Sequence, residues 1–185
     1  MNLYDLPKSL TVGGKQYPIR TDFRAVLDVL TACNDPELDD EAKMLVMLNI
    51  LLPTWKSIPE EHLEDACKKL CAFIDCGQKD DGKDSPRLID WEHDAGIIIP
   101  AVNAVAQTEV RAVKDLHWWT FFGYFMGIRE SLFSEVLNIR SKKAKHKKLE
   151  KWEREFYKEN RAIIDLNAVD AEEIRKEKDN ILKWL

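Results

Sequence analysis

The apolar residues of this chain recur mostly at the spacing of α-helices. Residues three or four positions apart share one face of a helix, and most of the apolar side chains follow this spacing. Proline, glycine and capping residues separate the periodic segments. The expected helices cover residues 21–34, 38–52, 57–76, 90–105, 113–127 and 130–139. The pattern therefore predicts a mainly α protein built as a multi-helix bundle.

One segment near the N-terminus has the pattern of a β-hairpin instead. Leu10-Thr11-Val12 and Lys15-Gln16-Tyr17-Pro18-Ile19 flank Gly13-Gly14, a dipeptide that accepts positive φ at both positions. Pro18 has no N–H to donate, so its strand must lie at an edge. Because an isolated two-stranded hairpin is only marginally stable, we expect it to pack on the helices.

Two of the expected helices carry unusual patterns. Residues 44–52 are apolar around the whole helix, which predicts a helix buried on every side at the centre of the core. The helix over residues 90–105 contains Pro100, whose missing N–H and ring disrupt a helix interior. We therefore expect a kink or a break between Gly96 and Pro100.

The segment from Asp115 to Phe133 holds seven of the 17 aromatic side chains, the densest run in the chain. Its helix, expected over residues 113–127, has two apolar faces, which predicts burial between neighbouring helices. Gly123 in the helix interior suggests that another backbone or ring approaches closely there. The residues expected to organise the core are Trp118, Trp119, Phe122, Gly123 and Phe125.

Composition limits the class of protein. The 185 residues are 33% charged and contain only seven Gly and seven Pro, as expected for a helical protein with long elements. The aromatic segment is too short and too interrupted by charge to cross a bilayer, so we expect no membrane insertion. Met1 is followed by no basic and apolar leader, which favours the cytoplasm.

Candidate chemistry is sparse. The spacing of His62, Cys67, Cys71 and Cys76 is not that of a zinc finger or ribbon, so buried structural thiols are the favoured interpretation. His117 has no nucleophile or acid at a telling spacing and is expected to be a core histidine. Gly13-Gly14 lacks the residues of a phosphate loop. We therefore expect no enzyme, no metal site and no cofactor.

The composition changes after residue 139, and we divide the chain into a helical core domain, 1–139, and a charged helical extension, 140–185. The extension opens with basic residues that could contact phosphates or an acidic partner, or could form a solvated helix start paired with nearby Glu residues. A narrow apolar stripe follows. The candidate partner-binding residues are Trp152, Phe156, Ile163, Ile174, Ile181, Leu185, Lys142, Lys143, Lys147 and Lys148.

Three segments together resemble the bacteriophage gene-product-fifteen family. They are Lys15-Gln16-Tyr17-Pro18-Ile19-Arg20-Thr21-Asp22-Phe23-Arg24, Asp90-Trp91-Glu92-His93-Asp94-Ala95, and Leu116-His117-Trp118-Trp119 followed by Phe121 and Gly127. The resemblance covers nearly the whole chain. Genes of this family usually lie just before the tape-measure gene of tailed phages, a position that usually encodes a tail assembly chaperone.

The resemblance implies a non-enzymatic chaperone in the cytoplasm of the bacterial host. Its expected partner is the tape-measure protein, with the tail tube protein as a further candidate and a homo-oligomer as the expected state. The aromatic helix or the C-terminal stripe could supply a groove for a partner helix. Two alternatives remain open: a structural tail or connector component retained in the virion, and a nucleic-acid-binding accessory protein using residues 140–151, the less favoured partner class.

Overall fold

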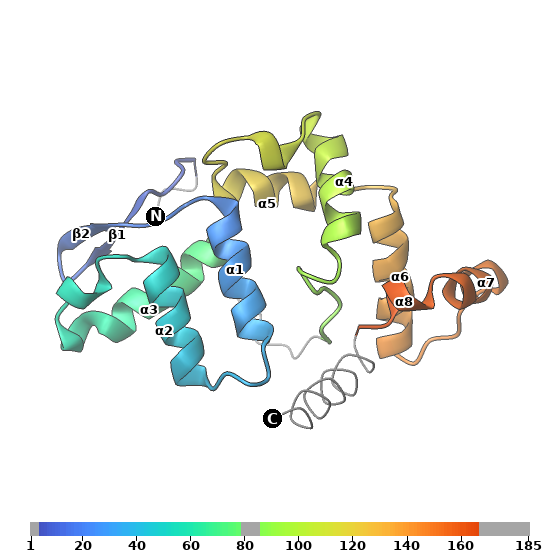
Figure 1. Cartoon of the computed structure of the whole chain (residues 1–185), viewed down its shortest axis with the longest axis horizontal. Coiled ribbons are helices and arrows are strands. Elements are labelled where there is room, and N and C mark those ends of the chain that lie inside the picture. Colours follow the sequence, from blue (N-terminus) through green and yellow to red (C-terminus); the bar gives the residue numbers. More distant parts are fainter. Residues whose placement is uncertain (1–3, 79–85, 167–185) are drawn as a thin grey trace, which may run out of the picture.

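The structure is a computed structural model that describes residues 4–78 and 86–166. Within these residues the chain forms eight α-helices, short 3₁₀ turns and a two-stranded antiparallel sheet, which confirms the mainly α prediction. The elements form an arch, with the hairpin at one end and the last three helices at the other (Figure 1). Most of the loop expected over residues 77–86 lies outside the described residues, as do Ile174, Ile181 and Leu185.

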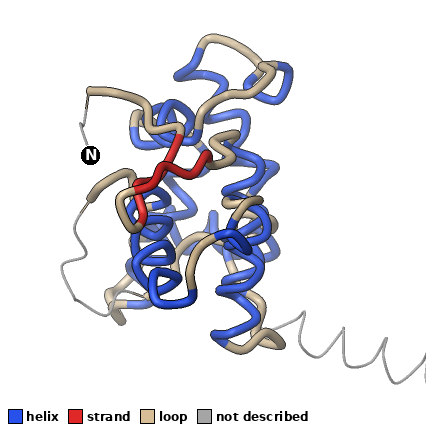
Figure 2. The backbone as a smooth tube through the Cα atoms, turned by 90° about the vertical axis from the view of Figure 1, so that its left-hand side faces the viewer, coloured by secondary structure: helices blue, strands red, loops and turns tan. Residues whose placement is uncertain are grey.

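The predicted hairpin is confirmed. Strand β1 (Ser9–Val12) pairs with β2 (Lys15–Pro18), with Val12 opposite Lys15 at the turn. Gly13 and Gly14 adopt φ of 54° and 77°, the left-handed values that a two-residue turn requires. Leu10, Val12 and Tyr17 are buried on one face. Figure 2 shows the hairpin lying against the helices, which is how a sheet of this size is stabilised.

The first three helices form the end of the arch beside the hairpin. Helix α1 (Phe23–Asn34) is capped by Asp22 and α2 (Asp40–Leu51) by Asp39, whose carboxylates accept backbone N–H bonds. Helix α3 (Leu63–Ile74) begins later than predicted, because residues 55–57 and 60–62 form 3₁₀ turns instead. These turns bury Ile58 beneath them.

The prediction that α2 is buried on every side is wrong. Met47, Leu48 and Leu51 are buried, but Met44 and Leu45 are 40% and 37% exposed. Helix α2 packs on α1 and α3 through one face, and it lies at the border of the arch (Figure 1). An all-apolar helix does not show which face is covered, and here part of its apolar surface stays in contact with solvent.

Helix α4 (Ala95–Ala106) passes through Pro100 as one element, so the predicted break is wrong. Pro100 and Gly96 are both exposed. Water can therefore satisfy the Gly96 carbonyl that Pro100 cannot bond. The helix begins five residues after Asp90, whose carboxylate accepts N–H bonds from Glu92 and His93 and holds residues 91–94 in turns.

The aromatic helix α5 (Trp118–Met126) is shorter than the predicted 113–127. Asp115 has a φ of 53°, and Asp22 and His117 form an antiparallel bridge. The Trp118 N–H donates to the Thr21 carbonyl at 2.7 Å. The residues before Trp118 are thus bonded to the segment before α1, a pairing of distant segments that helical periodicity does not report.

Helix α5 brings aromatic rings from several helices together. Phe121 stacks on Phe23 with ring centroids 4.3 Å apart, and Trp118 is 1% exposed. The Trp118 and Trp119 indole N–H groups donate to the carbonyls of Ile74 and Phe73 at the end of α3. The aromatic segment therefore joins α1, α3 and α5 into one core.

The expected close approach at Gly123 is wrong. Gly123 is exposed, and an added Cβ would meet nothing within 4 Å. The close approach occurs instead at Gly127, where such a Cβ would lie 3.0 Å from Val105 Cγ1. Phe122 and Phe125 are half-buried against the core. Gly127 is the residue at which α4 and the end of α5 meet.

Three helices complete the arch: α6 (Leu132–Ala144), α7 (Lys151–Glu159) and α8 (Arg161–Ile164). Helix α6 continues past the predicted end at Ile139, so the boundary expected between residues 139 and 140 falls inside it. Val136, Ile139 and Ile164 form a second, smaller apolar cluster. We call residues 145–166, which contain α7 and α8, the arm.

Candidate partner-binding surface

An open apolar groove lies between α4 and the beginning of α6. Its volume is about 260 Å³, and its lining is almost wholly apolar. The lining residues are Gly96, Ile97, Pro100, Ala101, Ala104, Ser131 and Leu132. Small side chains on α4 form the floor, because Gly96, Ala101 and Ala104 leave space that larger residues would fill. We call this feature the α4–α6 groove.

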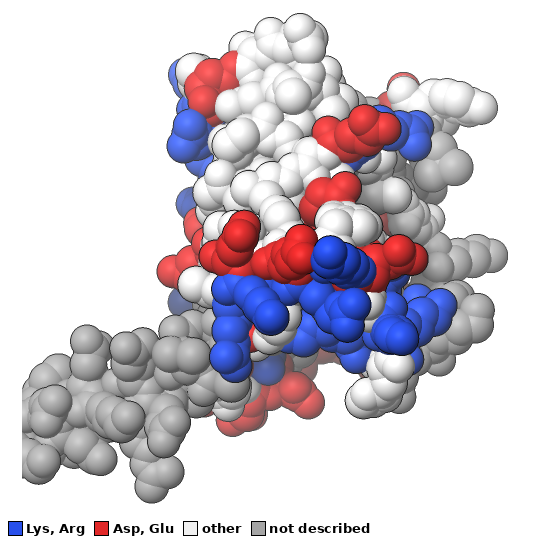
Figure 3. Space-filling model, turned by 90° about the vertical axis from the view of Figure 1, so that its right-hand side faces the viewer, with Lys and Arg blue, Asp and Glu red and all other residues white. Residues whose placement is uncertain are grey.

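Exposed apolar side chains extend the groove. Leu132, which lines it, is 44% exposed, Val105 is 37% exposed and Met126 is 59% exposed. Val105 follows Ala104 on α4, and its contact with Gly127 brings the end of α5 beside it. On the face that carries α6 and α7, uncharged side chains make up most of the upper part, with charged groups at its sides, and charged side chains dominate below (Figure 3). The groove itself, with its apolar lining, is the feature of this face that a partner could occupy.

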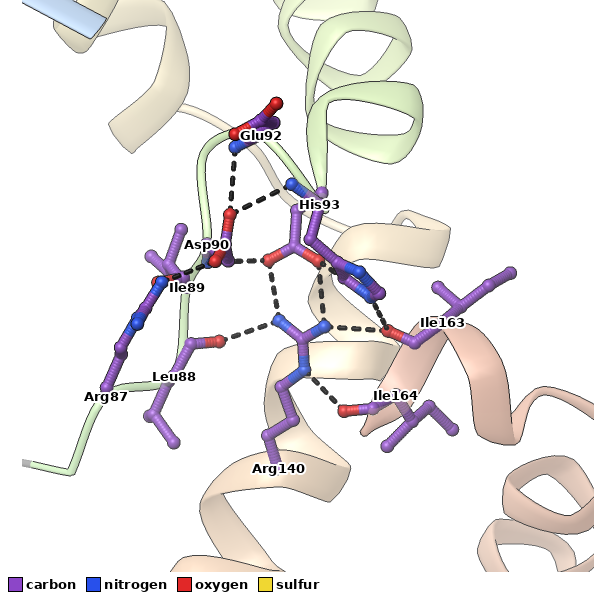
Figure 4. A network of polar contacts seen from close by, with 10 residues as sticks. Arg87, Leu88, Ile89, Asp90, Glu92, His93, Arg140, Ile163 and Ile164 are labelled. Atoms are coloured by element: carbon purple, nitrogen blue, oxygen red, sulfur yellow. Dashed lines mark hydrogen bonds and ion pairs between the residues drawn. The ribbon is translucent and has the colours of Figure 1, made fainter. Parts of the chain in front are cut away.

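A buried ion pair joins α4 to α6 below the groove. The Arg140 guanidinium donates to both oxygens of the Asp94 carboxylate, at 2.6 and 2.8 Å, and the two side chains are 5% and 0% exposed. Arg140 also donates to the carbonyls of Leu88, Ile163 and Ile164 (Figure 4). Every guanidinium N–H has an acceptor, which a buried Arg requires. We call this network the Arg140 clamp.

The clamp fixes the arm to the body. Its acceptors come from the segment before α4, which contains Leu88 and Asp94, and from the end of α8, so one side chain on α6 joins three segments. His93 Nε2 lies 3.3 Å from the Ile163 carbonyl and adds a further contact. Arg140, expected as the first residue of an exposed basic cluster, is therefore an internal structural residue.

Lys142 is also engaged internally. Its ammonium donates to the Glu153 carboxylate at 2.5 Å, and Glu153 is fully buried. The Glu150 backbone N–H and the Asn138 amide donate to the same carboxylate. The hydrogen bond from Lys142 is the main cause that holds the Glu153 pKa below its ordinary value, with burial acting in the opposite direction. This carboxylate joins α6 to α7.

Lys143 forms a third link between α6 and the arm. Its ammonium lies 3.9 Å from the centre of the Tyr157 ring, and it donates to the Tyr157 hydroxyl and to the Asp165 carboxylate. Burial acts to raise the Asp165 pKa, but hydrogen bonds from Lys143, Tyr157 and Arg161 outweigh it and leave that pKa lowered. Lys142 and Lys143 are thus neutralised by acids of the chain itself.

The remaining predicted binding residues differ in exposure. Lys147 and Lys148 are exposed, and Trp152 is 49% exposed. Phe156 and Ile163 pack against the second apolar cluster and hold the arm in place. Of the three stripe residues within the described chain, Trp152 is thus the one with a largely exposed side chain, while Phe156 and Ile163 pack internally. The residues that line the α4–α6 groove were not among the predicted ones.

The structure places the predicted core residues at different depths. Trp118 is fully buried, while Trp119, Phe122 and Phe125 are half-buried at the edge of the aromatic core. Gly123 contributes no packing. Phe121, which was not among the predicted core residues, is fully buried and stacks on Phe23.

The surroundings of the His and Cys residues considered for metal binding do not form a metal site within the described residues. Within residues 4–78 and 86–166, no group of three or more His, Cys, Asp and Glu side chains could hold a metal ion. The His62 ring covers the hairpin turn, 2.5 Å from where a Cβ on Gly13 would lie. Burial raises the Cys76 pKa to about 12, which keeps its thiol protonated. Cys71 is exposed, contrary to the expected buried thiol.

His117 serves as the N-cap of α5. Its Nδ1 accepts the Trp119 N–H at 3.1 Å, so the proton lies on Nε2, which donates to the Pro7 carbonyl at 2.9 Å. Both ring nitrogens are bonded to backbone groups, and the residue is only 7% exposed. The prediction of a core histidine is confirmed.

The groove, the clamp and the aromatic core all lie within one family match. Residues 3–166 match the model of the family described as bacteriophage Gp15 protein. The chain belongs to this phage protein family. No curated protein and no solved structure gave a match. The match ends at residue 166, two residues after the clamp acceptor Ile164. Among the described helices of this family member, none is long and apolar enough to span a bilayer.

Proposed function

We propose that this bacteriophage Gp15 family protein is a non-enzymatic tail assembly chaperone that binds the tape-measure protein in the cytoplasm of the bacterial host. The α4–α6 groove is the observation that carries the proposal. A groove with a small-residue floor and apolar rim suits the apolar face of a helix, which recognises such grooves through side chains spaced three and four residues apart. A long helical rod offers that face repeatedly.

The arrangement of charges supports a protein partner over nucleic acid. Arg140, Lys142 and Lys143 all bond to groups of the chain itself. Affinity for a polyanion depends on the number of phosphates that free basic groups neutralise. Three of the basic residues expected in the cluster are thus unavailable without breaking internal bonds, which weakens the alternative of a nucleic-acid-binding accessory protein.

Coating a long rod requires several copies of the chain, so the proposal includes a homo-oligomer on the tape-measure protein, released as the tail tube protein assembles. The other class of function, a structural tail or connector component, differs in where the chain ends up. A chaperone is absent from purified virions, whereas a connector component is retained in them.

Co-expression with the tape-measure protein tests the proposal. The substitution Leu132→Glu places a charge on the groove rim at a position that is 44% exposed. It lies at the first residue of α6, where a negative charge suits the helix dipole. Met44→Glu on α2 is the matched control, because Met44 is 40% exposed on a different element.

The wild type and Met44→Glu should keep the tape-measure protein soluble and co-purify with it, while Leu132→Glu should not. Thermal unfolding of the purified chains checks that both variants fold. If the wild type fails to bind, or if Leu132→Glu binds as well as Met44→Glu, the proposal is wrong.

A further inference from the structure

The α4–α6 groove lies beside the point where the described chain ends. Ile97 lines the groove and also packs against the second apolar cluster, which contains Ile164. Ile164 and Ile163 are held there by the Arg140 clamp, and Asp165 is bonded to Lys143 and Tyr157. Leu166 therefore leaves the body next to one end of the groove.

The 19 residues that follow, Asn167 to Leu185, have the composition to fill an apolar groove. Their large aliphatic side chains, Ile174, Ile181, Leu182 and Leu185, recur at the spacing of one helix face. Charged residues occupy most positions between them. This pattern is that of an amphipathic helix whose narrow apolar side needs a surface to cover it.

The dimensions agree with such a contact. As a helix, residues 174–185 would be about 17 Å long at 1.5 Å per residue, and the groove follows α4 from Gly96 to Ala104, about 12 Å by the same rise. The connection from Leu166 to Ile174 can extend to roughly 25 Å. The segment can therefore reach the groove with the arm held in place by the clamp.

We propose that residues 167–185 of the same chain occupy the α4–α6 groove when no partner is bound. A segment tethered this close has an effective concentration near the millimolar range, so a weak apolar contact suffices to keep it in place. The contact covers the apolar side chains of Leu132, Ala104 and Ile97 and so protects the chain from aggregation. A partner helix must then displace the segment, and this last consequence rests on the proposed function.

A photo-crosslinking experiment on the isolated full-length chain tests the proposal. A photoreactive phenylalanine replaces the exposed Leu132 on the groove rim or, as a control, the exposed Met44 on α2. Irradiation of the position-132 chain should give an intramolecular crosslink to a peptide within residues 174–185, identified by mass spectrometry. The position-44 chain should give no crosslink to that peptide.

Mixing isotopically labelled and unlabelled chains separates contacts within a chain from contacts between chains. Crosslinks that join a labelled to an unlabelled peptide would mean that a second copy fills the groove, and would overturn the proposal. Absence of any crosslink from position 132 to residues 174–185 would overturn it too. The variant Ile181→Asp/Leu182→Asp should lose the crosslink, while Lys178→Gln should keep it. No tape-measure protein is present, so this outcome is independent of the proposed function.

Discussion

Two regions of the arch, the core around α5 and the end that carries the arm, are held together by different physical interactions. Around α5, fully buried rings such as Trp118, Phe121 and Phe23 pack in direct contact. Beside the arm, the apolar cluster consists of Val136, Ile139 and Ile164, and buried or half-buried charges surround it. Apolar burial dominates in the first region, while charge-assisted hydrogen bonds dominate in the second.

Because of this difference, the aromatic core determines the stability of the whole fold, whereas the clamp determines how firmly the arm is attached to it. Loss of an aromatic ring leaves a cavity in the core on which the whole fold depends. Loss of a clamp residue leaves an unpaired charge, but the elements it joins are the arm and the segments beside it. The groove lies between the two regions, and Ile97 contacts both clusters. The arm is thus the part of the molecule whose release can change the groove.

The largest effect is expected in the aromatic core. Trp118→Ala should lower the free energy of unfolding by about 3 to 5 kcal/mol, because it removes a fully buried ring and its hydrogen bond to Ile74. Trp152→Ala removes the same side chain from a half-exposed position in the arm and should cost about 0.5 kcal/mol or less. Urea denaturation of both variants measures this. Equal losses would contradict the comparison.

The clamp should come next. Arg140→Met leaves the Asp94 carboxylate buried without its partner and frees the carbonyls of Ile163 and Ile164, at a cost of about 3 kcal/mol. Replacing both partners, as Asp94→Leu/Arg140→Met, should recover much of this loss. Hydrogen exchange should show faster exchange of the arm amides in the single variant. If α5 amides exchange faster to the same degree, the arm and the core are one cooperative unit.

A smaller and pH-dependent effect is expected at Glu153. Because its pKa is lowered in the folded chain, its contribution to stability is fully present above the ordinary carboxyl value of 4.5 and is lost as pH falls through the lowered pKa. Glu153→Gln should therefore destabilise at pH 7, by about 2 kcal/mol for a hydrogen bond to a charged group.

Denaturation curves of the wild type and Glu153→Gln, recorded from pH 7 to pH 3, measure this effect. The difference between the two proteins should shrink below pH 4.5. A difference that stays constant across this range would mean that the Glu153 charge contributes nothing.

The smallest effects are expected at two glycines. Gly123→Ala should stabilise the protein by up to about 1 kcal/mol, because the added methyl group meets no neighbour and alanine favours the helix. Gly13→Ala should destabilise it by about 1 kcal/mol or more, because Gly13 has a φ of 54° and the methyl group would meet the His62 ring. Melting temperatures would show opposite shifts. A loss of stability in Gly123→Ala would contradict the open space seen at Gly123 and would support the close approach that the sequence predicted there.

The sequence predicted the features that depend on neighbouring residues. The Gly13-Gly14 turn and the helical periodicity of α1 both follow from local chemistry, and the structure confirms them. The core position of His117 was also predicted correctly, because no nucleophile or acid near it in the sequence suggested catalysis. These features require no knowledge of which distant segments meet.

The features that sequence reasoning missed depend on contacts between distant segments. The Asp22–His117 bridge shortens α5, and the Asp94–Arg140 pair converts an apparent surface cation into a buried one. A single sequence does not indicate that two residues 46 positions apart, Asp94 and Arg140, are in contact. The small residues of α4, Ala101 and Ala104, gave the one available signal for a groove, but small residues also occur where helices pack closely.

Crosslinking between the groove and the tape-measure protein is the most direct test of the account. A photoreactive phenylalanine at position 132 or at position 44 is introduced into the full-length chain, which is co-expressed with the tape-measure protein and irradiated. The account predicts a crosslink to the tape-measure protein from position 132 on the groove rim and none from position 44 on α2. A crosslink from position 44 alone, or none from either position in a complex that co-purifies, would contradict it.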